Sequence, residues 1–275
     1  MTLKTVNLGI TAALLLLSAA AAAAAGAQAT VNGHSLYYLI RGSGPPLLLL
    51  HGGGNNVLRS WTRQIADFSP THEVIAPEQT GNGHTADVEG PFSYANMTED
   101  TAALLQQLHL KAVDVIGWSD GGIIALMLAV RHPDLVRRVV ATGANTDPSG
   151  LAGDGVGWLR MAPAASLMSS DILMDYDAVS PDGPAHALVV DEKLKQLWMT
   201  HPVPSELSME LLHTVRARVL VMAGDHDGIS LEHTLQIYRA LPHAELWILP
   251  NTGHDTFQSR PDWTDPYVLK FLGEP

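Results

Sequence analysis

A serine between two glycines is the feature of this chain whose setting could support covalent chemistry. Ser119 lies in Gly117-Trp118-Ser119-Asp120-Gly121, directly after the apolar segment 112–116 and before an apolar helical pattern. G-x-S-x-G between a strand and a helix is typical of a serine nucleophile held on a tight, strained turn. Side chains at positions 117 and 121 would collide with neighbouring chain, which accounts for both glycines. We predict that Ser119 is a nucleophile.

A serine hydroxyl becomes a good nucleophile only when a base removes its proton, and the base needs a partner that fixes its tautomer. Thirteen histidines are available. His254 follows the last predicted strand, 245–249, and so lies on a loop at the carboxyl end of that strand, where open α/β sheets build their sites. We predict that His254 is the base.

The acid that orients the base is expected on the loop after the preceding strand, 219–223. Gly224-Asp225-His226-Asp227 offers two carboxylates there, and either one gives the chain order Ser, Asp, His that suits this type of site. We choose Asp227, because the acid usually lies three residues after the glycine, and we expect Asp225 to brace the loop or to face solvent.

A tetrahedral oxyanion needs two N–H donors. One is expected from the backbone of Asp120, at the N-terminus of a helix. The other is expected from His51-Gly52-Gly53-Gly54, where missing side chains let the backbone approach a substrate. Gly53 is favoured by position and Gly54 is the alternative. His51 is expected to brace the loop.

The elements that position these residues follow from an alternation of short apolar segments with helical patterns, which indicates a mainly parallel sheet flanked by helices. We expect helices at 121–131, 231–241 and 266–272, and one that Thr98 caps. The expected strands are 35–40, 47–50, 74–76, 112–116, 136–142, 219–223 and 245–249.

The alternation breaks between residues 145 and 208, a stretch too long for a simple connection. We predict an inserted helical cap there, on a core formed by 30–144 and 209–275. Caps often line a pocket, although ordinary packing explains most single Met and Trp residues of the stretch, such as Trp158 and Trp198.

The first 29 residues have one cation, Lys4, then an apolar run from Leu8 to Ala25 and a small-residue stretch. This order predicts a secretory signal peptide, cleaved after Ala27 or Ala29, and a protein that is periplasmic or secreted. An uncleaved N-terminal anchor is the alternative. The chain has no cysteine, which excludes disulfides and a thiol nucleophile.

The chain is acidic. Its formal net charge is −12, and loss of Lys4 with the leader would make it −13. Such a surface disfavours nucleic acids and anionic membranes and favours small or neutral substrates. No His-Glu-x-x-His motif occurs, and Gly81-Asn82-Gly83 lacks the rest of a dinucleotide fingerprint, so we expect neither a metal nor a cofactor.

Along essentially the whole mature chain, the sequence resembles the α/β-hydrolase superfamily. The motifs that carry the resemblance are His51-Gly52-Gly53-Gly54, a loop at 78–85, 117–121, 224–227 and Gly253-His254. In the loop at 78–85, Glu78 and Thr85 replace the commoner Asp and Ser. The resemblance implies an α/β-hydrolase fold with an inserted helical cap.

Within the superfamily, the segments 117–122 and Gly143-Ala144-Asn145 look most like the valacyclovir-hydrolase, or biphenyl-hydrolase-like, branch. The branch implies that Asp120 recognises the α-amino group of amino-acid esters. The alternative is that Asp120 caps its helix and supplies only its N–H. We expect Asp120, Gly54 and Trp118 to contact substrate.

These observations predict an exported serine hydrolase that cleaves a small-molecule carboxylic ester through an acyl-serine intermediate. Two alternatives keep the same triad but cleave an amide or a C–C bond. A third is a non-catalytic binding protein on a hydrolase scaffold. Neither the acyl and alcohol groups nor the oligomeric state follow from the sequence.

Overall fold

The computed structural model describes residues 26–163 and 166–274. Most of the predicted signal peptide, residues 1–25, lies outside the described residues. Residues 27–29, which the prediction also assigned to it, begin the first strand, so cleavage after Ala29 would remove three of the five residues of that strand. Across the described part of the chain, no helix is long and apolar enough to cross a membrane.

Eight strands form one sheet in the order β1-β2-β4-β3-β5-β6-β7-β8. β1 pairs with β2 and β2 with β4 in antiparallel fashion, and the other five pairings are parallel. This confirms the predicted mainly parallel sheet. The strands are β1 (Ala27–Val31), β2 (His34–Arg41), β3 (Pro46–Leu50), β4 (Glu73–Pro77), β5 (Val113–Trp118), β6 (Val136–Thr142), β7 (Arg218–Gly224) and β8 (Ala244–Leu249).

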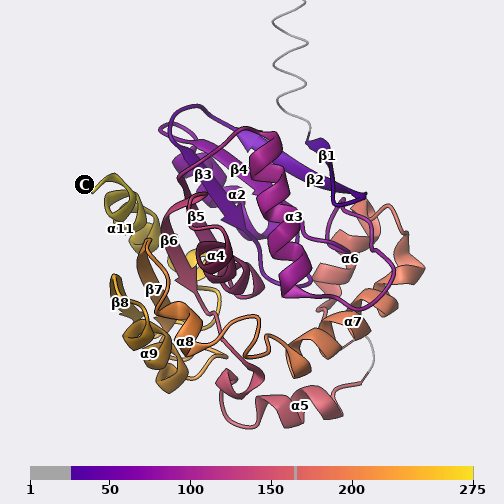
Figure 1. The fold of residues 1–275 in the computed structure, drawn as a ribbon. Helices are drawn as coiled ribbons and strands as arrows, with labels where there is room; N and C mark the ends of the chain where they lie inside the picture. Colours follow the sequence, from indigo (N-terminus) through magenta and orange to yellow (C-terminus); the bar gives the residue numbers. More distant parts are fainter. Residues whose placement is uncertain (1–25, 164–165, 275) are drawn as a thin grey trace, which may run out of the picture.

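Helices cover both faces of the sheet, because successive strand residues point to opposite sides and both sides are apolar (Figure 1). Leu48 and Leu50 face the cluster that includes α3, α4 and α9, whereas Leu47 and Leu49 face the one that includes α2 and α11. These helices are α2 (Val57–Phe68), α3 (Tyr94–Gln107), α4 (Asp120–Arg131), α9 (Leu231–Ala240) and α11 (Pro261–Gly273), and the short α10 (Thr256–Ser259) precedes α11.

Sequence reasoning placed the starts of two helices wrongly and overlooked several elements of the core, α10 among them. Helix α3 begins at Tyr94, where the side chain of Ser93 accepts the N–H of Asn96 at 3.3 Å. Thr98 lies inside this helix, and its hydroxyl donates to the carbonyl of Tyr94 at 2.7 Å, so the acids after Thr98 suggested a cap that the helix does not use. Helix α2 and the exposed edge strand β1 were not predicted, and α11 begins five residues before Pro266.

The stretch between β6 and β7 holds helical segments, and Figure 1 shows α5, α6 and α7 along the lower and right-hand part of the molecule, with α8 beside α9. They are η1 (Pro148–Gly150), α5 (Gly155–Met161), α6 (Ser170–Val179), η2 (Pro184–His186), α7 (Ala187–Thr200) and α8 (Met209–Leu212). Helix α8 packs against α4 and α9 of the core. We refer to residues 145–208 as the cap.

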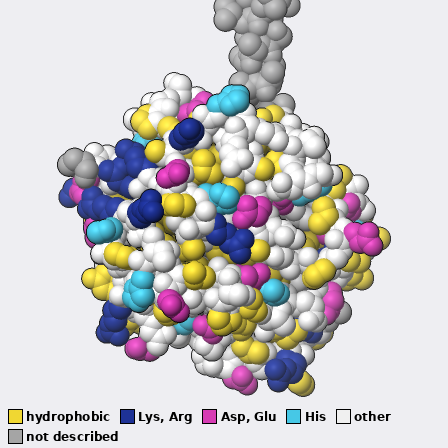
Figure 2. All heavy atoms as spheres, in the orientation of Figure 1, with side chains coloured by type: hydrophobic (Ala, Val, Ile, Leu, Met, Phe, Trp, Pro, Cys, Tyr) yellow, Lys and Arg dark blue, Asp and Glu magenta, His cyan; other side chains and the backbone are white. Residues whose placement is uncertain are grey.

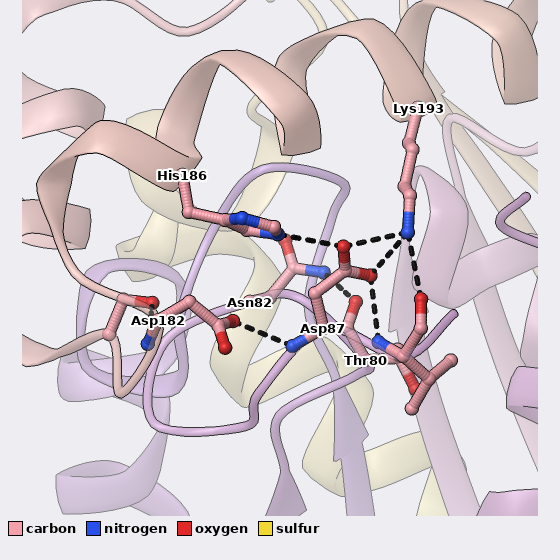
Figure 3. A network of polar contacts seen from close by, with 8 residues as sticks. Thr80, Asn82, Asp87, Asp182, His186 and Lys193 are labelled. Atoms are coloured by element: carbon pink, nitrogen blue, oxygen red, sulfur yellow. Dashed lines mark hydrogen bonds and ion pairs between the residues drawn. The ribbon is translucent and has the colours of Figure 1, made fainter. Parts of the chain in front are cut away.

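An ionic cluster around the buried carboxylate of Asp87 joins the cap to the loop after β4 (Figure 3). The carboxylate of Asp87, only 6% exposed, accepts hydrogen bonds from Lys193 at 2.7 and 2.8 Å and contacts His186 Nε2 at 2.8 Å. Its backbone N–H donates to Asp182 at 2.7 Å. Because the Asp87 charge is buried and multiply bonded, the cluster fixes η2 and α7 on the core.

On the face drawn in Figure 2, Lys and Arg side chains gather toward the side where the chain ends. The arginines at the end of the sheet near the C-terminus pair with acids. Arg218 donates to Glu274 at 2.7 Å and also bonds Glu245, and Arg137 forms a bidentate pair with the buried Asp114. The Arg218–Glu274 pair attaches the end of α11 to β7, and the other two pairs join neighbouring strands.

Candidate active site

Ser119 occupies the turn between β5 and α4, where φ is 56° and ψ is −121°. Such a backbone conformation costs a residue other than glycine on the order of 1–3 kcal/mol, so the surrounding packing must impose it. The close approach of chain explains the flanking glycines: a Cβ at Gly117 would lie 2.1 Å from the carbonyl oxygen of Gly121, and one at Gly121 would lie 2.1 Å from that of Leu50. The predicted strained turn is present.

The three residues predicted as a triad form one hydrogen-bonded chain. His254 Nε2 lies 2.9 Å from Ser119 Oγ, and His254 Nδ1 lies 2.6 Å from Asp227 Oδ1. A carboxylate only accepts hydrogen bonds, so Nδ1 carries the proton and Nε2 is free to accept the proton of the serine hydroxyl. The arrangement can activate Ser119 as a nucleophile.

The two carboxylates of the loop after β7 have separate tasks. Asp227 Oδ1 also accepts the N–H of Ile229 at 2.9 Å, which fixes the carboxylate against the imidazole. Asp225 points elsewhere and accepts the N–H of Thr252 at 2.9 Å, and N–H donors from Thr252 and Asn251 hold the pKa of Asp225 below its ordinary value. Asp225 therefore braces the loop that carries His254.

The imidazole of His254 is seated by its neighbours as well as by the acid. A Cβ at Gly143, where φ is +62°, would lie 2.7 Å from His254 Cε1, so only glycine leaves room for the ring. Trp118 Nε1 donates to the backbone carbonyl of His254 at 2.8 Å. The ring therefore has little freedom to leave the line between Asp227 and Ser119.

Three carboxylates raise the pKa of His254, and Asp227 and Asp120 contribute more than Asp255. Burial lowers the pKa of His254, but the hydrogen bond and charge of Asp227, together with the charge of Asp120, outweigh burial and raise this pKa above its ordinary value. The Asp227 contact is direct, and the Asp120 effect acts through space. Both stabilise the imidazolium that forms when His254 takes the serine proton.

The predicted oxyanion donors lie beside Ser119. Asp120 is the first residue of α4, so its N–H has no carbonyl acceptor within the helix. Gly53 lines the same cavity as Ser119. His51 Nε2 accepts the N–H of Gln79 at 3.0 Å, and its Nδ1 lies 2.8 Å from the carbonyl of Gly52, so His51 braces the glycine loop, as expected.

The side chains of Glu78 and Thr85 stabilise the loop at 78–85. They replace the residues that are commoner at these positions. Buried Glu78 accepts the N–H of Val57 at 3.0 Å, at the start of α2, and the N–H of His84 at 2.6 Å. Thr85 Oγ1 donates to the carbonyl of Glu78 at 2.7 Å. Glu78 and Thr85 therefore stabilise the loop at 78–85 and its contact with α2.

A cavity of about 600 Å³ opens above Ser119 between the core and the cap. Leu151, Trp158, Leu159, Trp198 and His201 line it from the cap side. Trp118 and Asp120, two of the predicted substrate contacts, also line it. Gly54 does not, and a Cβ there would lie 3.4 Å from Leu194 of α7. The cavity explains how a substrate reaches the serine.

The carboxylates that line the cavity make its charge negative. Among the described residues that line it, Asp120 and Asp154 are the acids and no Lys or Arg is present. An anionic substrate would meet repulsion without a counterion, whereas a neutral or cationic one would not.

The described residues also hold no cluster of three or more His, Cys, Asp or Glu side chains suited to a metal ion.

Two residues of the site were not found by sequence reasoning. Tyr94 of α3 donates its hydroxyl to Asp120 Oδ1 at 2.8 Å. Trp198 of α7 donates Nε1 to both carboxylate oxygens of Asp120, at 3.0 Å each. The Asp120 side chain therefore does not cap its own helix. Neither donor stands near a motif, and only the folded arrangement brings them together.

Comparison with known proteins identifies relatives of several kinds. A model of the "Alpha/beta hydrolase family" matches residues 47–265. A poly(3-hydroxyalkanoate) depolymerase from Ectopseudomonas oleovorans is 27% identical over 223 residues, covering 76% of this chain and 77% of the relative. The human serine hydrolase BPHL is 24% identical over 195 residues, covering 66% and 63%.

Solved structures share the fold. A meta-cleavage product hydrolase from Pseudomonas fluorescens IP01 superposes with a TM-score of 0.70 at 22% sequence identity, over 90% of this chain and 97% of that structure. At such identity the similarity concerns the fold. The resemblance drawn from the sequence motifs is thus confirmed, with a biphenyl-hydrolase-like protein as one relative among other hydrolases.

Proposed function

The chain belongs to the alpha/beta hydrolase family, and we propose that it is a serine hydrolase that cleaves carboxylic esters through an acyl-serine intermediate. The observation that carries the proposal is the hydrogen-bonded chain of Ser119, His254 and Asp227, in which Ser119 and His254 line a cavity. One relative, the depolymerase, is named for a polymer whose units are joined by ester bonds.

The reaction follows from this geometry in two halves. Ser119 Oγ attacks the ester carbonyl while His254 Nε2 takes its proton, and the backbone N–H groups of Asp120 and Gly53 bind the oxyanion. The C–O bond then breaks, and His254 gives its proton to the departing alcohol. Water attacks the acyl-serine with His254 again as base, which releases the carboxylic acid and restores the serine.

The cavity supports a neutral acyl group, since its apolar lining includes Trp118, Trp158 and Leu159 and no Lys or Arg of the described chain lines it. The carboxylate of Asp120 also suits a substrate that carries an ammonium group. Its carboxylate accepts three hydrogen bonds, and a substrate ammonium could approach its remaining lone pair. We also propose export, which rests on the sequence of residues 1–29 alone.

Turnover of p-nitrophenyl butyrate by purified protein tests the proposal. We expect hydrolysis by the wild type and a loss of kcat of about 10⁴-fold or more in Ser119→Ala, because no other group can form the acyl intermediate. Ser259→Ala, an exposed serine on α10, is the matched control and should retain activity.

Two further substrates in the same assay test amide cleavage and preference for an α-amino group. The p-nitroanilide of butyric acid tests amide cleavage with the same acyl group, and the p-nitrophenyl ester of valine tests preference for an α-amino group. Undiminished ester turnover by Ser119→Ala would refute the proposal. Turnover of the anilide in preference to the ester would replace it with an amidase.

A further inference from the structure

A buried carboxylate lies beside the two backbone groups that are expected to bind the oxyanion. Asp120 supplies one of these N–H groups, yet this residue is only 7% exposed and its carboxylate lies against Gly53, which is expected to supply the other. A Cβ on Gly53 would lie only 2.2 Å from Asp120 Oδ2. Negative charge thus stands close to the place where the reaction must develop further negative charge.

Such a carboxylate would obstruct catalysis if it could turn freely. Its oxygens would accept the N–H groups of the oxyanion hole, since a buried carboxylate gains from every donor within reach. The oxyanion would then lose its donors and face a like charge at low dielectric constant. Removing one oxyanion donor in an enzyme of this chemistry costs about 10²–10³ in kcat.

Two neutral donors fix the position of the Asp120 carboxylate. Tyr94 is 1% exposed and donates from α3 at 2.8 Å, and Trp198 donates from α7 to both oxygens at 3.0 Å. Burial and the neighbouring charge of Asp120 raise the pKa of Tyr94 well above its ordinary value, so its hydroxyl stays protonated and remains a donor.

Gly53 of the glycine loop packs against both the Asp120 carboxylate and the Trp198 ring. The Cβ that Gly53 lacks would lie 2.8 Å from Trp198 Cζ2 as well as 2.2 Å from Asp120 Oδ2, so a side chain at this position would displace both groups. The indole ring, the carboxylate and the glycine backbone are therefore packed against one another. One of these three components belongs to the cap.

We propose that Tyr94 and Trp198 are positioning residues that hold the Asp120 carboxylate out of the oxyanion hole. The proposal rests on the acyl-serine function proposed above. Because Trp198 comes from α7, the cap contributes a residue that acts on the transition state of the reaction and not only on substrate binding. Such a role affects kcat more than KM.

The test compares Tyr94→Phe, Trp198→Phe and the double variant with p-nitrophenyl butyrate. Tyr94→Phe removes only the donor hydroxyl, and Trp198→Phe replaces the indole with a smaller aromatic ring that has no donor. We expect the double variant to lose about 10–100-fold in kcat, with KM within about threefold of wild type. Tyr267→Phe and Trp263→Phe, both exposed on α11, make the same chemical changes far from the cavity and should retain activity.

The decisive arm adds Asp120→Asn to the double variant. Removal of the charge removes the need for restraint, so kcat should recover by about tenfold. No recovery would show ordinary structural damage and overturn the inference, as would an unchanged kcat or a loss confined to KM. The melting temperature of each variant shows whether it is folded. If the double variant is misfolded, the same comparison of kcat with and without Asp120→Asn is made in Tyr94→Phe and in Trp198→Phe. If the wild type itself turns over no ester, the proposed function fails instead.

Discussion

The two buried carboxylates of the site, Asp227 and Asp120, differ in what holds them and in how their charge is used. Asp227 contacts the imidazole of His254 directly and is fixed by the N–H of Ile229, so every partner comes from the loops after β7 and β8. Asp120 follows Ser119 as the first residue of α4. Its donors, Tyr94 and Trp198, come from α3 of the core and α7 of the cap.

The comparison shows that burial alone does not define the role of a charge. Asp227 fixes the tautomer of His254 and stabilises its protonated form through a hydrogen bond. Asp120 reaches His254 only through space, and two neutral donors share its charge. The direct partners of the first carboxylate belong to the core alone, whereas one donor of the second belongs to the cap.

The largest effect that separates the two carboxylates is expected from Asp227→Asn. The amide favours the wrong tautomer of His254, so kcat for p-nitrophenyl butyrate should fall by about 10⁴-fold. Asp225→Asn is the control on the same loop. Its side chain meets backbone N–H groups and not His254, so kcat should stay within about threefold of wild type. A large loss in Asp225→Asn together with a small one in Asp227→Asn would reverse the assignment.

A smaller effect is expected from Asp120→Asn on the pH dependence of kcat/KM. His254 must be neutral to accept the serine proton, and the charge of Asp120 contributes to the raised pKa of His254. Without that charge the pKa of His254 falls, so the acid limb of the profile should move to lower pH. The midpoint of that limb in Asp154→Asn, another carboxylate of the cavity, should stay in place.

A midpoint for Asp120→Asn that is unchanged or lies at higher pH would show that the Asp120 charge does not reach His254. The two carboxylates would then differ more sharply than the structure indicates, with Asp227 alone acting on the base. Measurement at two ionic strengths separates this local effect from the net charge of the protein, because salt screens exposed charges more than buried ones.

Chain order is why Asp227 could be predicted from the sequence and the partners of Asp120 could not. In a parallel sheet the loops after successive strands meet at one edge, so Ser119, Asp227 and His254 were expected together once β5, β7 and β8 were recognised. Tyr94 and Trp198 stand 104 residues apart on two helices, and no local pattern records that both turn toward one carboxylate.

The same distinction applies to the fold. Strands β2 to β8 were predicted because they are short apolar segments, whereas β1 buries only Val31 and lies at the edge of the sheet. The cap was expected from its length alone. Its attachment through Asp87, His186 and Lys193 was not, since the three residues look like ordinary surface charges until the chain is folded.

Covalent labelling of Ser119 tests the central claim most directly. Diethyl p-nitrophenyl phosphate transfers a diethylphosphoryl group to an activated serine and releases p-nitrophenol. We expect the wild type to gain one such group, located by mass spectrometry on the peptide that contains Ser119, with no gain in Ser119→Ala and a much slower gain in Asp227→Asn. Absence of an adduct on Ser119 in protein that hydrolyses p-nitrophenyl butyrate, or an adduct on another residue that tracks the loss of activity, would contradict the account.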